Sequence, residues 1–163
     1  MYNFGDLAKE TLEQMSSKGV FLTVKNGEKI NTMTIGWGSL SQYWGEEIFI
    51  VPVRHSRYTF ELLKNTDEFT VSVPLGGKMD DQLKYCGSVS GRNEDKLKNI
   101  KTAPAKEIST PVIEGCDIFY ECKILTYSDL EKDKLPKELA MRWYGDSDMH
   151  RLYFAKIISA YKK

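Results

Sequence analysis

The dipeptide Asn26-Gly27 constrains the fold of this chain more than any other short stretch of its sequence. It follows the apolar segment 20–25, and an Asn-Gly pair in that position is the strongest short-range signal for a two-residue β-hairpin, because both residues accept positive φ angles. The chain should therefore double back here, so that residues 29–43 pair antiparallel with residues 20–25. Such a start is typical of an antiparallel fold and not of a doubly wound parallel sheet.

Alternation of apolar and polar residues predicts further strands, with short helices between them. The expected strands cover residues 47–53, 68–74, 111–125 and 150–160, and the expected helices cover residues 6–17, 57–64, 79–85 and 93–99. Residues 128–139 are charged and contain Pro136, which indicates an exposed loop or a frayed helix. The sequence therefore predicts a mainly β fold with inserted helices (α+β), a barrel or sandwich of antiparallel strands, in one domain over residues 1–163.

A few positions make sharper predictions within these elements. Leu7, Leu12 and Met15 should form the buried face of the first helix. Pro52 has no N–H for a ladder hydrogen bond, so it should lie at a sheet edge, a bulge or a strand end. Residues 68–74 alternate between apolar and polar, which predicts a strand with one buried and one exposed face.

The composition describes an ordinary globular protein without surplus charge. Hydrophobic residues make up 41% of the 163 residues, and Lys+Arg equals Asp+Glu at 23 each. A nucleic-acid-binding protein normally carries a basic surplus, so that class of partner is disfavoured. A formal net charge of zero gives little protection against self-association, which fits an oligomer. With neither a signal peptide nor an apolar run of roughly 20 residues, we expect a soluble, cytoplasmic protein without a membrane segment.

The cysteines and the missing motifs narrow the chemistry. Cys116 and Cys122 lie in one expected strand, about 20 Å apart at about 3.3 Å per residue, which is too far for a disulfide. The three cysteines therefore indicate reduced thiols. Histidines and cysteines lack zinc-ligand spacing, so no metal site is expected. No Gly-x-Gly-x-x-Gly or Gly-x-Ser-x-Gly motif is present, so a dinucleotide-binding domain and a serine hydrolase have no support.

Residues 31–39 combine short polar side chains with glycines inside an expected strand. Glycine within a strand often marks a place where another group approaches the backbone closely. The alternative is an edge strand whose threonines simply favour β structure, with its tryptophan in a core or an interface. The candidate binding residues of this segment are Asn31, Thr32, Met33, Thr34 and Trp37.

A second polar cluster lies at the start of the expected helix 57–64. Its guanidiniums and hydroxyls, next to the unpaired amides of a helix N-terminus, would suit an anion and above all a phosphate. The alternative is a plain serine N-cap with solvated arginines. The candidate residues of this cluster are Arg54, Ser56, Arg57 and Thr59.

A third segment, residues 86–92, follows the expected helix 79–85. Its glycines would let the backbone turn tightly, and its serines supply hydroxyls, although a helix C-cap and a plain loop would look the same. A nucleophilic role for the cysteine would need a basic partner. Lys96 is a weaker phosphate candidate, since a solvated helix lysine is the simpler interpretation. The candidate residues of this segment are Cys86, Gly87, Ser88 and Ser90.

In this order, the three segments resemble the flavin-reductase-like proteins with an FMN-binding split barrel, a family that includes the flavoredoxins. The resemblance spans residues 21–127. It rests on Asn31-x-Met33-Thr34-x-x-Trp37, on Arg54-x-Ser56-Arg57-x-Thr59, and on residues 86–92 followed by Asp95-Lys96.

This resemblance implies a split β-barrel that binds FMN. It implies that Arg57 and Thr59 are the best phosphate ligands, with Arg54 and Ser56 next. It also implies that residues 32–34 meet the pyrimidine edge of the flavin and that the segment with Cys86 lies beside it. Such barrels are usually homodimers in which the partner subunit completes the flavin site.

The activity implied by the resemblance is that of an oxidoreductase. Electrons would pass from NAD(P)H, docked transiently, or from a redox partner through bound FMN to free flavin or another acceptor. No catalytic side chain is identified, because the cofactor carries the chemistry. The alternatives are an FMN-binding electron carrier of flavoredoxin type with a protein partner, and a sensory flavin-binding module without turnover. A pyridoxamine-phosphate-oxidase-like activity is a further alternative, since that enzyme shares the barrel.

Overall fold

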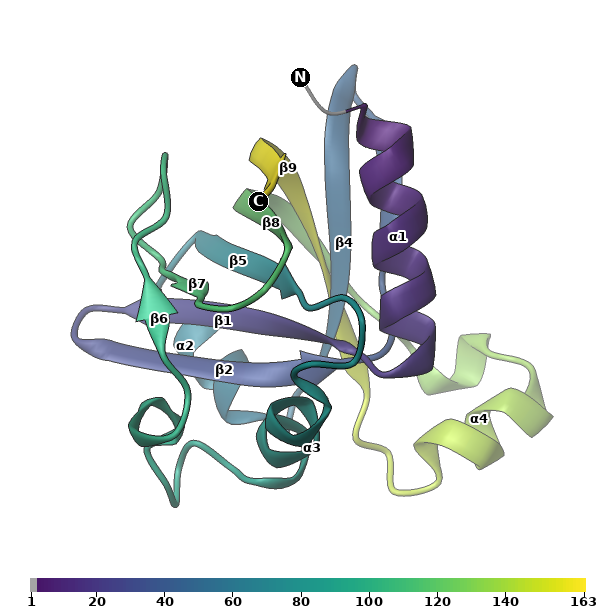
Figure 1. Cartoon of the computed structure of the whole chain (residues 1–163). Coiled ribbons are helices and arrows are strands. Elements are labelled where there is room, and N and C mark those ends of the chain that lie inside the picture. Colours follow the sequence, from purple (N-terminus) through teal and green to yellow (C-terminus); the bar gives the residue numbers. More distant parts are fainter. Residues whose placement is uncertain (1–2) are drawn as a thin grey trace.

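The structure, a computed structural model, describes residues 3–163 and is built around one antiparallel sheet (Figure 1). Seven strands form it in the order β2-β1-β5-β8-β9-β4-β3. They are β1 (Val20–Asn26), β2 (Lys29–Ile35), β3 (Ser39–Tyr43), β4 (Glu46–Arg54), β5 (Glu68–Val73), β8 (Ile118–Asp129) and β9 (His150–Lys162), while β6 (Thr102–Ala103) and β7 (Val112–Ile113) pair separately. The helices are α1 (Phe4–Ser17), α2 (Tyr58–Leu63), α3 (Asp80–Ser88) and α4 (Lys137–Tyr144).

The predicted hairpin is confirmed, but its second strand ends earlier than expected. β1 and β2 pair as far as Asn26 and Lys29, and the turn begins with Gly27 at φ 60°. β2 stops at Ile35, and the next strand, β3, pairs with β4 at the opposite edge of the sheet. The prediction that residues 29–43 form one partner of β1 is therefore wrong beyond residue 35.

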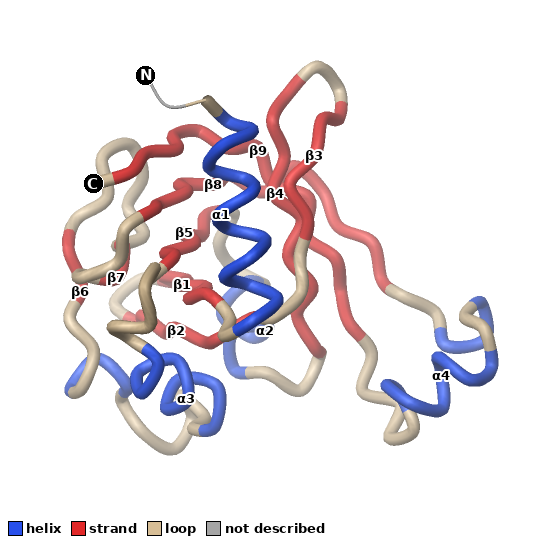
Figure 2. The backbone as a smooth tube through the Cα atoms, turned by 45° about the vertical axis from the view of Figure 1, so that its right-hand side comes forward, coloured by secondary structure: helices blue, strands red, loops and turns tan. Residues whose placement is uncertain are grey.

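Residues 36–38 force the sheet to roll, because they connect two strands that lie at its opposite edges. Four peptide steps of about 3.5 Å reach roughly 14 Å. Seven strands about 4.8 Å apart would make a flat sheet roughly 29 Å wide. The edges therefore approach each other (Figure 2), yet no strand pairing joins β2 to β3 within residues 3–163. The result is an open, rolled sheet of split-barrel type, which confirms the predicted fold class.

Helix α1 packs where the two edges approach. Leu7, Thr11 and Met15 form its buried face, and they repeat every four positions. Leu12 is 40% exposed, so its predicted place on this face is wrong. A Cβ on Gly38 would lie 3.2 Å from Sδ of Met15, so glycine at this position lets the link between β2 and β3 lie directly against the helix.

The shorter inserted elements differ from the prediction in their boundaries. Arg57 is the N-cap residue of α2 and no side chain caps that helix, so the predicted cap by Ser56 is wrong. Helix α3 is longer than expected and takes residues 86–88 into its last turn. Residues 93–99 form only a short 3-10 turn, Lys96–Lys98, in place of the predicted helix.

Residues 128–139, predicted as an exposed loop or a frayed helix, contain the end of β8, a 3-10 turn (Lys132–Lys134) and the start of helix α4, which continues to Tyr144. The helix begins directly after Pro136, a residue that is well tolerated at the start of a helix because its missing N–H has no partner there anyway. Figures 1 and 2 show α4 projecting beyond the sheet. Leu139, Met141 and Trp143 are 44%, 66% and 40% exposed, so α4 keeps much of its apolar surface uncovered within this chain.

Strand β5 is buried on both faces, so the prediction of a half-exposed strand at residues 68–74 is wrong. The segment before β7 covers its outer face: the hydroxyl of Thr70 donates to the carbonyl of Pro111 at 2.6 Å, and the N–H of Ile113 donates to the hydroxyl of Ser72 at 3.0 Å. The inner face points into the main core, which includes Leu22, Phe49, Val51, Phe69, Val71 and Tyr120.

Two smaller predictions can be compared directly. Pro52 lies at an edge as predicted, because β3 pairs with β4 only as far as Ile50. The single strand expected over residues 111–125 is instead two strands, β7 and β8, separated by a turn with Gly115 at φ 91°.

The cysteines are Cys86, Cys116 and Cys122, and all three are buried and free, in agreement with the expected reduced thiols. None of the helices formed by residues 3–163 is both long and apolar enough to span a membrane.

Candidate functional site

Two adjoining cavities follow the edge strand β2. One, of about 200 Å³, lies towards α4 and β9. The other, of about 180 Å³, lies between β2, the start of α2 and the end of α3. Met33, Thr34 and Arg57 line both, so the cavities form one groove. Each is smaller than a typical ligand site of roughly 300–1,000 Å³, whereas the groove as a whole reaches that range.

The two ends of the groove differ in chemistry and are named accordingly. The aromatic cavity is lined, besides the shared residues, by Ile35, Gly36, Trp37, Pro52, Arg54, Trp143 and His150. The polar cavity is lined, besides the shared residues, by Asn31, Ser56, Tyr58, Thr59, Lys96 and residues 86–92. All the binding residues predicted from the sequence line this groove except Thr32, whose carbonyl oxygen accepts a hydrogen bond from Lys96.

Two cations of the polar cavity have no acidic partner. Arg57 is exposed, and within residues 3–163 its guanidinium makes no hydrogen bond or ion pair. Lys96 is only 4% exposed, and its Nζ donates to the carbonyls of Thr32 and Cys86 at 2.8 and 2.9 Å. Burial lowers the pKa of Lys96, and the positive charge of Arg57 adds to this effect. Such a pair of cations suits a phosphate.

The sequence identified Lys96 only as a weaker phosphate candidate. It is a buried lysine held by backbone carbonyls and not the solvated helix lysine that was the simpler interpretation. No local signal distinguishes it from Lys98, which lies in the same turn and is exposed. Only the fold, which brings this turn against β2, gives Lys96 its place.

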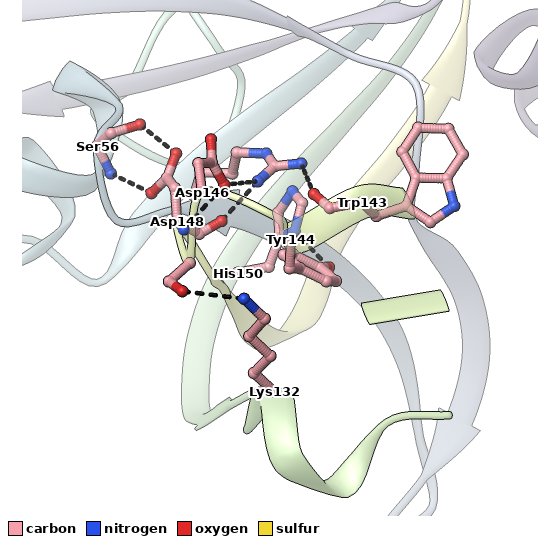
Figure 3. Close-up of polar contacts among 9 residues, drawn as sticks. Ser56, Lys132, Trp143, Tyr144, Asp146, Asp148 and His150 are labelled. Carbon is pink, nitrogen blue, oxygen red and sulfur yellow. Dashed lines mark hydrogen bonds and ion pairs between the residues drawn. The ribbon is translucent and has the colours of Figure 1, made fainter. Parts of the chain in front are cut away.

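Arg54 and Ser56 are engaged with the turn that precedes β9. Arg54 donates to the carbonyl oxygens of Asp148 and Trp143 at 2.5 and 2.9 Å. The hydroxyl and the N–H of Ser56 donate to the two carboxylate oxygens of Asp148 at 2.5 and 3.1 Å (Figure 3). Of the four predicted phosphate ligands in this cluster, these two therefore anchor the turn 145–149, and Arg57 is the cation whose guanidinium has no partner within residues 3–163.

The polar side chains of β2 are used mainly inside the protein. Asn31 donates to the hydroxyl of Thr59 at 2.9 Å, and both residues are buried. The hydroxyl of Thr34 donates to the carbonyl of Leu83 on α3 at 2.6 Å. The hydroxyl of Thr34 is therefore left as an acceptor for a ligand, whereas the hydroxyl of Thr59, which accepts from Asn31, keeps its own hydrogen to donate.

The backbone of β2 offers free hydrogen-bond donors and acceptors, whereas most of its polar side chains already have partners inside the protein. The carbonyl of Thr32 points away from β1, because it accepts from Lys96, and β2 is the edge strand of the sheet. In an antiparallel pair, residues two apart turn their backbone groups to the same side. The N–H and the C=O of Thr34 therefore point to the same edge, and an edge strand presents unpaired donors and acceptors. A ring edge that carries donors and acceptors can pair with such a strand.

The third predicted segment closes the polar cavity as the last turn of α3 (residues 86–88) followed by a loop (residues 89–92), the arrangement that the alternative interpretation described. A Cβ on Gly87 would lie 3.4 Å from Cβ of Thr34, so Gly87 allows the last turn of α3 to approach β2 closely. Cys86 is 2% exposed, and burial raises the pKa of its thiol to about 11. The hydroxyl of Ser88 donates to the carbonyl of Tyr85, and the hydroxyl of Ser90 accepts from the N–H of Arg92. Both serines are therefore used within their own part of the chain.

The aromatic cavity is built around two tryptophans and a histidine. The rings of Trp37 and Trp143 meet edge to face with centroids 4.9 Å apart, and the ring of His150 lies 5.2 Å from that of Trp37. Burial lowers the pKa of His150 to about 4, and the charge of Arg54 adds to this, so the imidazole is neutral at pH 7. From the sequence, His150 was considered only as a metal ligand. Neither His150 nor Trp143 was predicted as a residue of the binding site.

Comparison with known proteins agrees with this geometry. The sequence model of the flavin reductase like domain matches residues 12–161. A crystal structure of flavoredoxin from Methanosarcina acetivorans is 28% identical, with a TM-score of 0.69 over 90% of this chain and 69% of its own. The NADH:FAD oxidoreductase of Streptomyces globisporus shares the fold at 18% identity, with a TM-score of 0.70 over 90% of this chain and 76% of its own.

A curated relative, an uncharacterized protein of Archaeoglobus fulgidus, is 31% identical over 116 residues, which make up 70% of this chain and 64% of that relative. The chain thus spans less than two thirds of that relative's length. A rolled antiparallel sheet with a groove along its edge strand defines the class of flavin-binding split barrels. Within that class, the chain belongs to the flavin reductase-like family, and the resemblance drawn from its sequence is confirmed.

Proposed function

We propose that this chain binds FMN in the groove and acts as a flavin reductase-like oxidoreductase that takes electrons from NAD(P)H. The observation that carries the proposal is the continuity of the two cavities through Met33, Thr34 and Arg57. One end has the donors for a phosphate and the other has flat apolar walls for a second ring. When bound, FMN supplies the electron-transfer chemistry, and the protein supplies position and access.

The residues of the chain divide this task. Arg57 and Lys96 would hold the phosphate, and the free edge of β2 at Thr34 would orient the ring through its backbone. Trp37 and Trp143 would exclude water above it. The neutral His150 and the protonated thiol of Cys86 add no charge of their own to the groove. The binding residues predicted from the sequence are part of this proposal, with Arg57 ahead of Arg54 and Ser56.

The test is to add FMN to the purified protein, follow flavin fluorescence and absorbance, and then add NADH without oxygen. Saturable binding followed by fast loss of the absorbance of oxidised flavin is the expected result. Failure to bind FMN would overturn the proposal as a whole. Lys9→Ala, an exposed lysine on α1 outside both cavities, serves as the matched control for all charge variants.

A second candidate function is that of an electron carrier with a protein partner. It is favoured by the likeness to a flavoredoxin, which at 28% identity is closer than the likeness to the oxidoreductase at 18%. The same experiment separates the two functions. A carrier would bind FMN but would be reduced by NADH only negligibly, and would require a reduced protein to take up electrons.

We also propose that the chain is a homodimer. Tyr43 at the end of β3 and Trp44 on the turn that follows are 47% and 64% exposed, and α4 leaves Met141 66% exposed. Large exposed apolar side chains of this kind are the ones that a protein interface would cover. Sedimentation equilibrium should give twice the mass of 18.7 kDa, and a monomer at micromolar concentration would contradict the proposal.

A further inference from the structure

Tyr144 and His150 form a buried pair beside the aromatic cavity (Figure 3). Tyr144 ends α4 and His150 begins β9, and the hydroxyl oxygen of Tyr144 lies 2.7 Å from Nδ1 of His150. The two residues are only 4% and 7% exposed. The turn between them is fixed from outside, because Arg54 donates to the carbonyls at both of its ends, Trp143 and Asp148. The protein fold itself thus holds the pair together.

The direction of this hydrogen bond can be worked out from the partners. Within residues 3–163 the hydroxyl of Tyr144 makes no other hydrogen bond. If it accepted from Nδ1, its own hydrogen would be left unpaired at a buried position, which is costly. Burial raises the pKa of Tyr144 and lowers that of His150, so the phenol keeps its hydrogen and the imidazole carries only one. The phenol therefore donates to Nδ1, and the hydrogen of the imidazole lies on Nε2.

Nε2 is the ring nitrogen of His150 that Tyr144 leaves without a partner. It makes no hydrogen bond within residues 3–163 and is not among the buried unpartnered side-chain atoms, so a ligand in the cavity that His150 lines can reach it. The other side-chain N–H groups of this cavity, from Arg54, Arg57 and the two tryptophans, are donors as well. No Asp, Glu, Asn or Gln among the described residues lines it. Apart from the Thr34 hydroxyl, the polar side-chain groups of this cavity are N–H donors, and such donors between aromatic walls favour a flat ring that carries an acceptor.

We infer that Tyr144 is a positioning residue that holds His150 as an Nε2–H donor, so that the aromatic cavity takes a flat ring carrying a carbonyl oxygen. The identity of that ring rests on the proposed function, in which the carbonyl belongs to the carboxamide of the nicotinamide. The position of the hydrogen on His150 does not depend on that function.

The first test is the tautomer of His150, measured by nitrogen NMR on protein with labelled histidine. The chain has two histidines, and a His55→Gln variant assigns the signals. The wild type should show a protonated Nε2 and an unprotonated Nδ1, and Tyr144→Phe should show a mixture of tautomers. Tyr120→Phe is the matched control, because it removes another buried hydroxyl with one hydrogen bond, 2.8 Å from that of Thr11. An Nδ1–H tautomer in the wild type, or an unchanged one in Tyr144→Phe, would overturn the inference.

The second test is the reduction of the FMN-loaded protein by NADH. Tyr144→Phe should raise the KM for NADH by about twofold, because an even mixture of tautomers leaves half of the molecules with a donor at Nε2, and should leave the affinity for FMN unchanged. The preference of the wild type for NADH over its thioamide analogue, whose sulfur is a weak acceptor, should shrink in the same variant. A preference that Tyr144→Phe leaves unchanged would refute the selection of a carbonyl. A wild type that NADH does not reduce would refute the proposed function instead, and the tautomer would still be decided by NMR.

Discussion

The polar and aromatic cavities share one groove but are built by opposite means. The polar cavity keeps two cations, Arg57 and Lys96, without an acidic partner. The aromatic cavity keeps a histidine that burial holds neutral, and Arg54, the arginine that lines only this cavity, donates to backbone carbonyls. One end can therefore attract a doubly charged group, and the other can only accept an uncharged ring. This difference gives a ligand a fixed orientation along β2.

The largest effect should come from Lys96. Lys96→Met removes a buried charge from the polar cavity, and we expect the affinity for FMN to fall by about 3 kcal/mol, the upper range for a hydrogen bond to a charged group. The affinity for riboflavin, which lacks the phosphate, should fall much less. Fluorescence titration measures the two affinities. Lys98→Met, in the same turn but exposed, is the control and should bind FMN like the wild type. Equal losses for FMN and riboflavin would place the phosphate elsewhere.

The next effect concerns the neutrality of the aromatic cavity. Burial lowers the pKa of His150 to about 4 in the folded protein, against about 6.5 in an unfolded chain. The unfolded chain therefore binds the extra proton first, and folding stability falls as the pH drops from about 6.5 towards 4. Between pH 7.5 and 5 this amounts to about 2 kcal/mol.

The variant His150→Asn isolates this contribution, because asparagine keeps an acceptor for Tyr144 but does not titrate. Urea unfolding at pH 7.5 and 5 should show a smaller loss of stability in the variant than in the wild type. His55 and the carboxylates are common to the two proteins, so their contributions cancel. An identical loss in the two proteins would show that His150 is not held neutral by the fold.

The smallest effect should come from Ser56, although it lines the polar cavity. Its hydroxyl donates to Asp148, so Ser56→Ala should lower the free energy of unfolding by about 1 kcal/mol and change the affinity for FMN by less than about 0.5 kcal/mol. Thermal unfolding and fluorescence titration measure these two quantities. A loss of affinity as large as that of Lys96→Met would mean that Ser56 is released from Asp148 to bind the phosphate.

The same comparison explains what the sequence could predict. The residues of the polar cavity come in short motifs, and the family resemblance that these motifs carry predicted that they gather. The hairpin at Gly27 and the last strand, β9, were predictable from local patterns. In the aromatic cavity, Trp37 contacts Trp143 and His150, which lie more than a hundred positions away in the sequence. No local sequence pattern predicts these two contacts.

Long-range partners also decide which polar residues are free. Ser56 differs from Arg57 only because Asp148, 92 positions away, binds it. Lys96 differs from Lys98 because its turn packs on β2. The half-exposed strand predicted for residues 68–74 was wrong for the same reason, since a distant segment covers its outer face. Sequence periodicity describes one helix or strand at a time. Whether a polar residue is free, or a strand face exposed, depends on contacts between two elements.

The most direct test of the central claim, that the polar cavity holds the phosphate of FMN, is the affinity of Arg57→Ala for FMN and for riboflavin. The account predicts that FMN binding weakens by about 1.5–3 kcal/mol, as expected for a lost hydrogen bond to a charged group, while riboflavin binding stays the same. The preference of the wild type for FMN should shrink accordingly. An unchanged preference for FMN in Arg57→Ala would contradict the assignment of the phosphate to this end of the groove.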